Sequence, residues 1–175
     1  MEVKKINFDT FAKAIENCED KFAKKMRRGV IDDSCQDLLK AFYVDGKPVA
    51  FIATKKIRDY SNLKWIMTLP EARGKGAFRA LCDDAVRTAW EDGSRYFRVS
   101  INAPALGAYE KVGFQVCGKQ RGDCYLSAGR LTSPYVEYID WSIDEQIWKW
   151  INQKPRGGCI EIFVDPPENK QTTLF

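Results

Sequence analysis

The chain alternates between strand-like and helix-like segments over its first 131 residues, and this order restricts the folds that it can adopt. Two apolar, β-prone segments at 39–45 and 47–55 meet at Asp45-Gly46, a pair typical of a tight hairpin turn. Because strands and helices alternate, the pattern predicts an α/β domain with one central sheet. Further strands are predicted at 2–8, 63–69, 96–101, 114–117 and 124–127.

The first predicted helix follows Asp9, which has the side chain of an N-cap. Apolar residues then recur at helical spacing. The basic residues 24–28 precede Gly29 and suit a helix C-terminus, where cations meet the negative end of the dipole. We expect a solvated helix end there rather than a nucleic-acid patch. The apolar positions are Phe11, Ala14, Ile15, Cys18 and Phe22.

Two more helices are predicted in the middle of the chain. An amphipathic stripe predicts a helix over 77–91, and Phe78 lies on that stripe, so its side chain is expected to face the core. A short helix opens at Pro104 and ends at Gly113, since proline favours a first turn and glycine a C-terminal cap.

The pattern changes after residue 131 and indicates an added α/β segment. Strands are predicted at 135–139 and 160–164. Between them, Ser142 and Glu145 have the spacing of a capping box and predict a helix that ends at Asn152. The apolar residues of this helix are read as a packing face rather than as base-stacking groups. They are Ile143, Ile147, Trp150 and Ile151.

The chain contains no histidine, which excludes Ser-His-Asp and Cys-His catalysis and every histidine-based metal site. Its six cysteines are scattered without a C-x-x-C pair, so neither disulfides nor a metal centre are predicted. No apolar run approaches the roughly 20 residues that span a bilayer, and the first residues lack the pattern of a signal peptide. We therefore predict a cytoplasmic protein. The net charge of +4 permits a nucleic-acid or coenzyme A partner and demonstrates neither.

A glycine-rich turn at 70–78 joins a predicted strand to a predicted helix. Its sequence is Pro-Glu-Ala-Arg-Gly-Lys-Gly-Ala-Phe. Glycines let a backbone approach a ligand closely, and a helix N-terminus offers unpaired N–H groups and a positive dipole end. This arrangement suits a pyrophosphate, although such turns also serve as tight connections.

A second pattern follows the next strand, with Asn102, Ala105, Tyr109, Gly113 and Phe114 at the spacing N-x-x-A-x-x-x-Y-x-x-x-G-F. Residues four apart share a helix face, so a small side chain lies beside an aromatic hydroxyl. Such a face could admit a ligand and offer it a proton. Taken alone, the pair favours a core tyrosine packed by an alanine.

Together the two patterns resemble those of the GNAT N-acetyltransferases, which show P-E-x-R-G-x-G after the fourth strand and N-x-x-A-x-x-x-Y-x-x-x-G-F after the fifth. The resemblance covers about residues 40–118, with order and spacing intact. It implies the GNAT fold, whose mixed and mostly antiparallel sheet is flanked by helices and opens in a splay between its fourth and fifth strands. It also implies direct transfer of an acetyl group from acetyl-CoA to an amine, with no covalent enzyme intermediate.

The resemblance assigns roles residue by residue. Tyr109 would be the general acid that protonates the departing thiolate, which is reasonable because a phenol remains protonated at neutral pH. Ala105 would leave room for the ligand beside it. Asn102 would contact the pantetheine arm, and strand residues Met67 and Thr68 would lie alongside that arm. The backbone N–H groups that would bind the pyrophosphate are those of Arg73, Gly74, Lys75, Gly76 and Ala77.

The general base has no clear candidate in the sequence. The strand at 63–69 carries no acidic residue, so the candidates are carboxylates elsewhere or a chain of waters. Glu71 is expected to face solvent. Glu137 and Asp140 belong to the added segment and could reach the acceptor site.

The last five residues resemble the Q-x-x-L-F peptide by which many proteins bind the bacterial sliding clamp, through Gln171, Leu174 and Phe175. This leaves two alternatives open beside the leading one. The chain could be a phage-type enzyme that modifies DNA bases on a GNAT scaffold, or an interaction module that has lost catalysis. The predicted division of the chain is a GNAT core at 1–131, an extension packed on that core at 132–165, and a flexible tail at 166–175.

Overall fold

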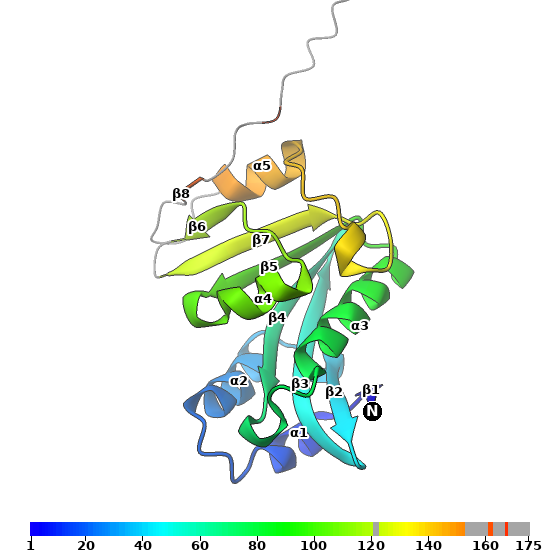
Figure 1. The fold of residues 1–175 in the computed structure, drawn as a ribbon, viewed down its shortest axis with the longest axis vertical. Coiled ribbons are helices and arrows are strands. Elements are labelled where there is room, and N and C mark those ends of the chain that lie inside the picture. The colour runs from blue at the N-terminus through cyan, green and yellow to red at the C-terminus, as the bar shows by residue number, and fades with distance from the viewer. Residues whose placement is uncertain (121–122, 153–160, 163–166, 168–175) are drawn as a thin grey trace, which may run out of the picture.

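The computed structural model describes residues 1–120, 123–152, 161–162 and 167. It contains an eight-stranded sheet in the order β1-β2-β3-β4-β5-β7-β6-β8 (Figure 1). Only the β4–β5 pair is parallel among the described strands, so the predicted mixed and mostly antiparallel sheet is confirmed. The strands are β1 (Glu2–Lys5), β2 (Leu39–Val44), β3 (Lys47–Ile57), β4 (Tyr60–Thr68), β5 (Tyr96–Asn102), β6 (Gly118–Gln120), β7 (Cys124–Arg130) and β8 (Glu161–Ile162).

Helices cover both faces of this sheet. On one face, α3 (Ala77–Glu91) and α4 (Leu106–Val112) pack on a core that includes Phe42, Leu81 and Ile101. On the other face, α1 (Phe8–Ala14) and α2 (Lys21–Asp32) pack on a second core around Phe11 and Phe51. Helix α5 (Glu145–Asn152) forms a third cluster with β5 and β7. Figure 1 shows α3 and α4 in front of the sheet and α1 behind it.

Strands β4 and β5 separate after a short paired stretch. Their pairing runs from Tyr60–Tyr96 to Leu63–Val99, and both strands continue beyond it. Lys64 has no partner on β3, because Leu63 pairs with Thr54 and Trp65 with Ala53. The bulge at Lys64 coincides with the start of the separation, as expected of a bulge that bends its strand. The predicted splay is therefore confirmed.

Several predicted elements have the predicted form. The turn at Asp45-Gly46 places both residues at positive φ, 49° and 74°, as a type I′ hairpin requires. Helix α3 has the predicted bounds. Helix α4 ends at Gly113 with φ 113°, a conformation that favours glycine.

The single N-terminal helix predicted after Asp9 is wrong, because the structure has two. Helix α1 begins two residues earlier and is capped by Asn7, whose side chain accepts from the Thr10 N–H at 2.8 Å. A second cap, Asp20, accepts from the Phe22 N–H at 2.8 Å and opens α2. The apolar spacing is continuous across both helices, whereas the caps divide them.

The sequence predicts that a helix ends at Gly29, and this is wrong. Gly29 lies buried within α2. A methyl group added at Gly29 would come within 1.9 Å of Cζ2 of Trp65 on β4. The glycine is therefore required for close approach of the helix to the sheet. The basic residues before it lie in the middle of α2, with Asp32 as its last residue.

Three local predictions in the second half of the chain are also wrong. Residues 114–117 form no strand, because the Phe114 N–H bonds to the Tyr109 carbonyl and completes the end of α4. Residues Val136–Tyr138 form a 3₁₀ turn instead of a strand. Helix α5 is capped by Asp144, which accepts from the Ile147 N–H at 2.9 Å, while Ser142 donates to Asp140. The predicted packing face of α5 is confirmed, since Ile147, Trp150 and Ile151 are buried.

The predicted strand at 160–164 is described only at β8, which pairs with β6. The tail at 166–175 lies outside the described residues except for Pro167. Within the described part of the chain, no helix is long and apolar enough to cross a membrane.

Candidate active site

A pocket of about 210 Å³ opens where β4 and β5 separate. Four consecutive β4 residues line it, starting at the last β4–β5 pair, and three consecutive β5 residues line it, starting one residue after that pair. Side chains from α4 close it on one face of the sheet and side chains from α2 on the other. The lining residues are Phe22, Lys25, Leu63, Lys64, Trp65, Ile66, Ser100, Ile101, Asn102, Ala105 and Tyr109.

The α4 side of the pocket carries three of the residues that the sequence singled out. Ala105, which ends a 3₁₀ turn and is the N-cap of α4, lines the pocket together with Tyr109, so the two residues face the same space as predicted. Asn102 lines it from the end of β5, and its side-chain oxygen accepts from the Cys124 thiol at 3.1 Å. The two readings of the tyrosine are both correct in part, because Tyr109 is 3% exposed and yet borders the pocket.

Tyr109 is held by aromatic contacts rather than by polar ones. Its ring meets those of Phe78 and Phe114 edge to face, at centroid distances of 4.9 and 5.4 Å. Phe78 thus packs against the core as predicted. Within the described residues the Tyr109 hydroxyl has no hydrogen-bond partner. Its proton is therefore available to a molecule in the pocket.

The protonation state of Tyr109 follows from its burial. Loss of solvation raises the pKa of this phenol well above 10, and the neighbouring Cys82 raises it further. Both effects disfavour the charged phenolate. Tyr109 is consequently a proton donor throughout the neutral and mildly alkaline range.

The glycine-rich turn lies between β4 and α3 and presents a row of unpaired backbone donors. Gly74 and Gly76 both adopt φ 78°, and neither would place a methyl group within 4 Å of another atom. From Gly74 to Arg79, no N–H group has an acceptor among the described residues. The 15-residue helix α3 adds its positive dipole end. These donors fit an anion such as a pyrophosphate, and the exposed surface around the two glycines leaves room for it.

The set of free donors begins one residue later and ends two residues later than predicted. The Arg73 N–H bonds to the Pro70 carbonyl at 3.3 Å and is already used within a 3₁₀ turn. The Arg73 guanidinium pairs with Asp20, the α2 cap, at 3.1 Å. Lys75 is exposed on the turn. The donors that the turn offers therefore begin at Gly74.

Met67 and Thr68 lie farther along β4 than the pocket. The Met67 side chain is 6% exposed in the α1–α2 core, and neither residue lines the pocket. Both pair with β3 on one side and lie beyond the last β5 pair on the other. Their open strand edge runs from the pocket toward the glycine-rich turn.

The α2 side of the pocket is not predicted by the sequence patterns. Phe22 packs on Trp65, with ring centroids 6.1 Å apart, and the Trp65 indole N–H donates to Asp33 at 2.7 Å. Lys25 and Lys64 add two cations to the lining. The available signal is the spacing of Phe22, Lys25 and Gly29, which places them on one helix face.

None of the carboxylates considered in the sequence reaches the pocket. Glu71 is exposed, as predicted. Asp140 pairs with Arg130, which lies opposite Tyr96 at the far end of β5, about 20 Å from the pocket end for a seven-residue strand. Glu137 lies near Asp83 of α3 instead: burial raises the pKa of Asp83, and the charge of Glu137 raises it further. No acidic residue belongs to the pocket lining.

Comparisons with known proteins agree with this geometry. A family model described as an acetyltransferase (GNAT) domain matches residues 4–127. A PaiA N-acetyltransferase from Thermoplasma acidophilum, solved in complex with coenzyme A, superposes with a TM-score of 0.56 at 15% identity, over 74% of this chain and 98% of its own. The ribosomal-protein-S18-alanine N-acetyltransferase from Escherichia coli gives 0.59 at 18% identity, over 75% and 94%.

An IAA acetyltransferase from Bacillus cereus gives a TM-score of 0.59 at 17% identity, over 74% of this chain and 99% of its own. At such identities the superpositions establish the fold alone. A search of curated protein sequences gives no match. The family model, which spans more than half of the chain, carries the assignment.

Proposed function

The chain belongs to the GNAT acetyltransferase family, and on this premise we propose that it transfers an acetyl group from acetyl-CoA directly to an amine. The observation that carries the proposal is the position of the Tyr109 hydroxyl, which is buried, protonated and without a partner among the described residues beside the pocket in the splay. The free N–H groups from Gly74 onward lie at the other end of the same open strand edge.

Acetyl-CoA supplies the acyl group as a thioester. The N–H groups from Gly74 to Arg79 bind its pyrophosphate, and the open edges of β4 and β5 hold the pantetheine arm in the splay. Asn102 contacts that arm at the end of β5. The thioester then lies in the pocket beside Ala105, whose small side chain leaves space for it.

The acceptor amine attacks the thioester carbonyl, a carbon–nitrogen bond forms and the carbon–sulfur bond breaks. Tyr109 donates its proton to the departing sulfur. The proton released by the amine passes to solvent, because no carboxylate lines the pocket. Tyr109 regains a proton from solvent in turn. None of the cysteines is needed as a nucleophile.

Calorimetric titration of the full chain with acetyl-CoA and CoA tests the donor. We expect dissociation constants of about 1–100 µM, in the usual range for enzyme substrates. Thiol release in the presence of amines then tests transfer. Absence of binding at millimolar concentration would contradict the proposal and favour a non-catalytic interaction module.

We further propose, from the sequence alone, that the chain binds a bacterial sliding clamp through Gln171, Leu174 and Phe175, which lie outside the described residues. Such recruitment in the cytoplasm would bring the enzyme to DNA, where a modified base is the alternative product. Titration of a purified clamp with the full chain and with a chain lacking residues 171–175 tests this. Equal affinity of the two chains would reject the clamp proposal without touching the donor assignment.

A further inference from the structure

Helix α2, which contributes Phe22 and Lys25 to the pocket lining, is strongly basic. It contains five basic residues and one acidic residue, Asp32, so that its formal charge is 5 − 1 = +4. The whole chain has 28 basic and 24 acidic residues, also +4, so the remaining residues sum to zero. The basic residues are Lys21, Lys24, Lys25, Arg27 and Arg28, and all of them are exposed.

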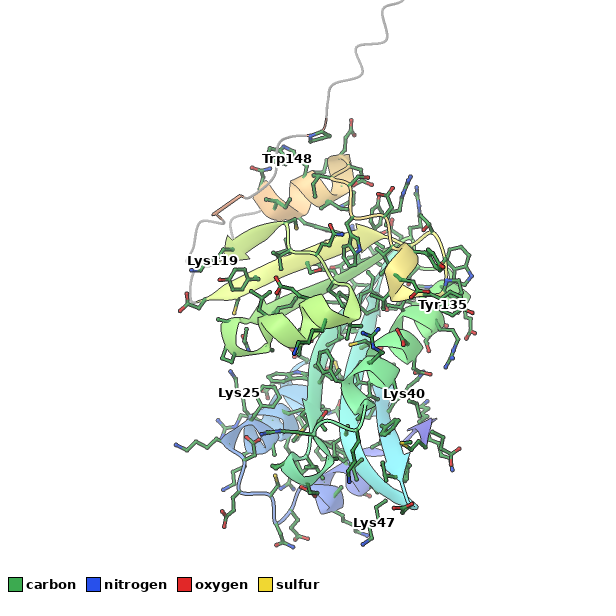
Figure 2. The ribbon with its side chains drawn as sticks, in the orientation of Figure 1. Lys25, Lys40, Lys47, Lys119, Tyr135 and Trp148 are labelled. Atoms are coloured by element: carbon green, nitrogen blue, oxygen red, sulfur yellow. The ribbon has the colours of Figure 1, made fainter. Side chains whose placement is uncertain are left out.

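One of these residues lines the pocket, where a second lysine joins it. Lys25 projects from α2 and Lys64 from the β4 bulge. Figure 2 shows Lys25 on the side of α2 that is nearer to α4. Lys25 has no ion-pair partner among the described residues. Both cations therefore face the space between α2 and the strands.

Lys64 is only partly neutralised. Its ammonium lies 4.0 Å from Asp33, and the same carboxylate accepts the Trp65 indole N–H at 2.7 Å. The second interaction fixes Asp33 beside Trp65 and divides its charge between two donors. Since the lining contains no acid, the pocket presents a net positive charge to whatever enters from the α2 side.

This charge bears on the acceptor. Simple alkylamines are cations at neutral pH, so two lysines oppose their entry and no carboxylate of the lining attracts them. A carboxylate or phosphate on the acceptor reverses the balance, because lysine ammonium groups bind such anions well. A field concentrated on one helix also steers anions toward that helix as they diffuse.

We propose that the acceptor is a small molecule that carries both an amine and a carboxylate or phosphate, with Lys25 and Lys64 binding the anionic group. The inference rests on the proposed acetyl transfer and names its substrate class. A pocket of about 210 Å³ has room for the thioester and a small amine. Lys25 and Lys64 are thus specificity-determining residues that contact the acceptor.

Two matched pairs of amines test this class by CoA release from acetyl-CoA. One pair is butylamine and 4-aminobutyrate, and the other is ethanolamine and phosphoethanolamine. We expect kcat/KM to be at least tenfold higher for the anionic member of a pair. The pair with the larger ratio tells whether a carboxylate or a phosphate is recognised.

Variants at adjacent positions of α2 separate a specific contact from general charge. Lys25→Glu should lower kcat/KM for the anionic acceptor by at least tenfold and leave acetyl-CoA affinity unchanged. Lys24→Glu makes the same charge change about 100° around the helix axis, where Lys24 lines a separate groove with Ile15 and Ile31. It should change kcat/KM by less than threefold. Lys64→Gln should reproduce the loss seen for Lys25→Glu.

Several outcomes overturn the inference. If the amine without an anionic group has the same kcat/KM as its anionic partner, the inference is rejected and the proposed acetyl transfer is unaffected. Equal effects of Lys24→Glu and Lys25→Glu on kcat/KM lead to the same conclusion. If no amine is acetylated, binding is tested instead. The amide chemical shifts of residues 22–25 are followed during titration with 4-aminobutyrate, phosphoethanolamine or a single-stranded oligonucleotide. No shift with either small anion at 20 mM rejects the inference, and a shift with the oligonucleotide alone points to nucleic acid. Failure to bind acetyl-CoA instead rejects the proposed function.

Discussion

The two faces of the sheet build their halves of the site from different parts of the polypeptide. On the α3–α4 face, the donors of the glycine-rich turn are backbone N–H groups, and Gly74 and Gly76 act by adopting φ 78°. On the α1–α2 face, the pocket is made of side chains, among them Lys25, Lys64 and Trp65. A backbone site needs a fixed pattern of glycines, whereas a side-chain site can change with every substitution. The donor half is therefore the half that a sequence pattern reveals.

The most damaging change to the donor half is Gly76→Asp. The substitution places a carboxylate on the N-cap of α3, beside the N–H groups that we assign to the pyrophosphate. Repulsion between like charges at close range should raise the dissociation constant of acetyl-CoA by at least about 100-fold. Calorimetry measures this directly.

Gly93→Asp is the matched control for this variant. Gly93 has φ 72° and, like Gly76, open space around an added Cβ atom, but it follows the other end of α3. The backbone strain and the added charge are the same in both variants. Equal loss of acetyl-CoA binding in the two variants would show that the pyrophosphate does not bind at the glycine-rich turn.

Tyr109→Phe tests the chemistry of the donor half while leaving its shape intact. We expect kcat to fall about 10- to 100-fold, at or below the low end of general-acid effects because a thiolate is a fair leaving group. Acetyl-CoA affinity should change by less than about twofold, since the ring contacts with Phe78 and Phe114 remain. A large loss of affinity would instead show that the hydroxyl is structural.

The pH dependence of the wild-type enzyme gives an independent test of Tyr109. Burial raises the pKa of this group well above 10, so its proton-donating form persists as the pH rises from 7 to 10. Initial rates should show no decline from this group in that range. A loss of kcat with a midpoint below pH 9 that is absent in Tyr109→Phe would contradict the raised pKa of Tyr109, whereas the same loss in both enzymes would come from another group.

The parts of the fold that could be predicted are those in which local chemistry and tertiary packing agree. Helix α3 is predicted with its observed bounds because a polar face and an apolar face alternate without interruption. The break between α1 and α2 escapes prediction, although Asp20 is a good N-cap, because the apolar spacing continues across it. The strand predicted at 114–117 is wrong because the backbone of Phe114 completes α4 instead of pairing in the sheet.

The site residues also fall into those that local sequence patterns predict and those that only tertiary packing brings together. Tyr109 and Ala105 are predictable because Ala105 is the N-cap of α4 and Tyr109 lies one turn into that helix, so that helical spacing fixes their relation. Lys25 and Lys64 are 39 positions apart in the sequence and meet only because α2 packs across β4. No local rule relates them. The bulge that leaves Lys64 without a β3 partner likewise depends on strand register rather than on composition.

Gly29→Ala tests the acceptor half through the packing of α2 on β4. The added methyl group would lie 1.9 Å from a Trp65 ring atom, so the helix or the ring must move. Such overpacking should cost about 1–3 kcal/mol of stability. The displaced Phe22 and Trp65 should lower kcat/KM for the acceptor severalfold, with acetyl-CoA affinity nearly unchanged.

Gly107→Ala provides the comparison for that variant. Gly107 is also helical, but an added Cβ atom there meets nothing within 4 Å. Alanine should therefore stabilise α4 by about 0.5–1 kcal/mol. Urea unfolding of both variants distinguishes helix propensity from packing, and equal stability changes would show that α2 tolerates a side chain against Trp65.

Asp20 joins the two halves, and its variants should have the smallest effects. Its carboxylate caps α2 through the Phe22 N–H and pairs with Arg73 beside the glycine-rich turn. Asp20→Asn keeps a capping oxygen and should change stability by less than about 0.5 kcal/mol, whereas Asp20→Ala should cost about 1 kcal/mol. Both variants release Arg73, and because exposed ion pairs are weak, acetyl-CoA affinity should rise only about twofold. Calorimetry with Asp20→Asn measures this second effect alone, and a weaker affinity would show that Asp20 holds the turn in its binding conformation.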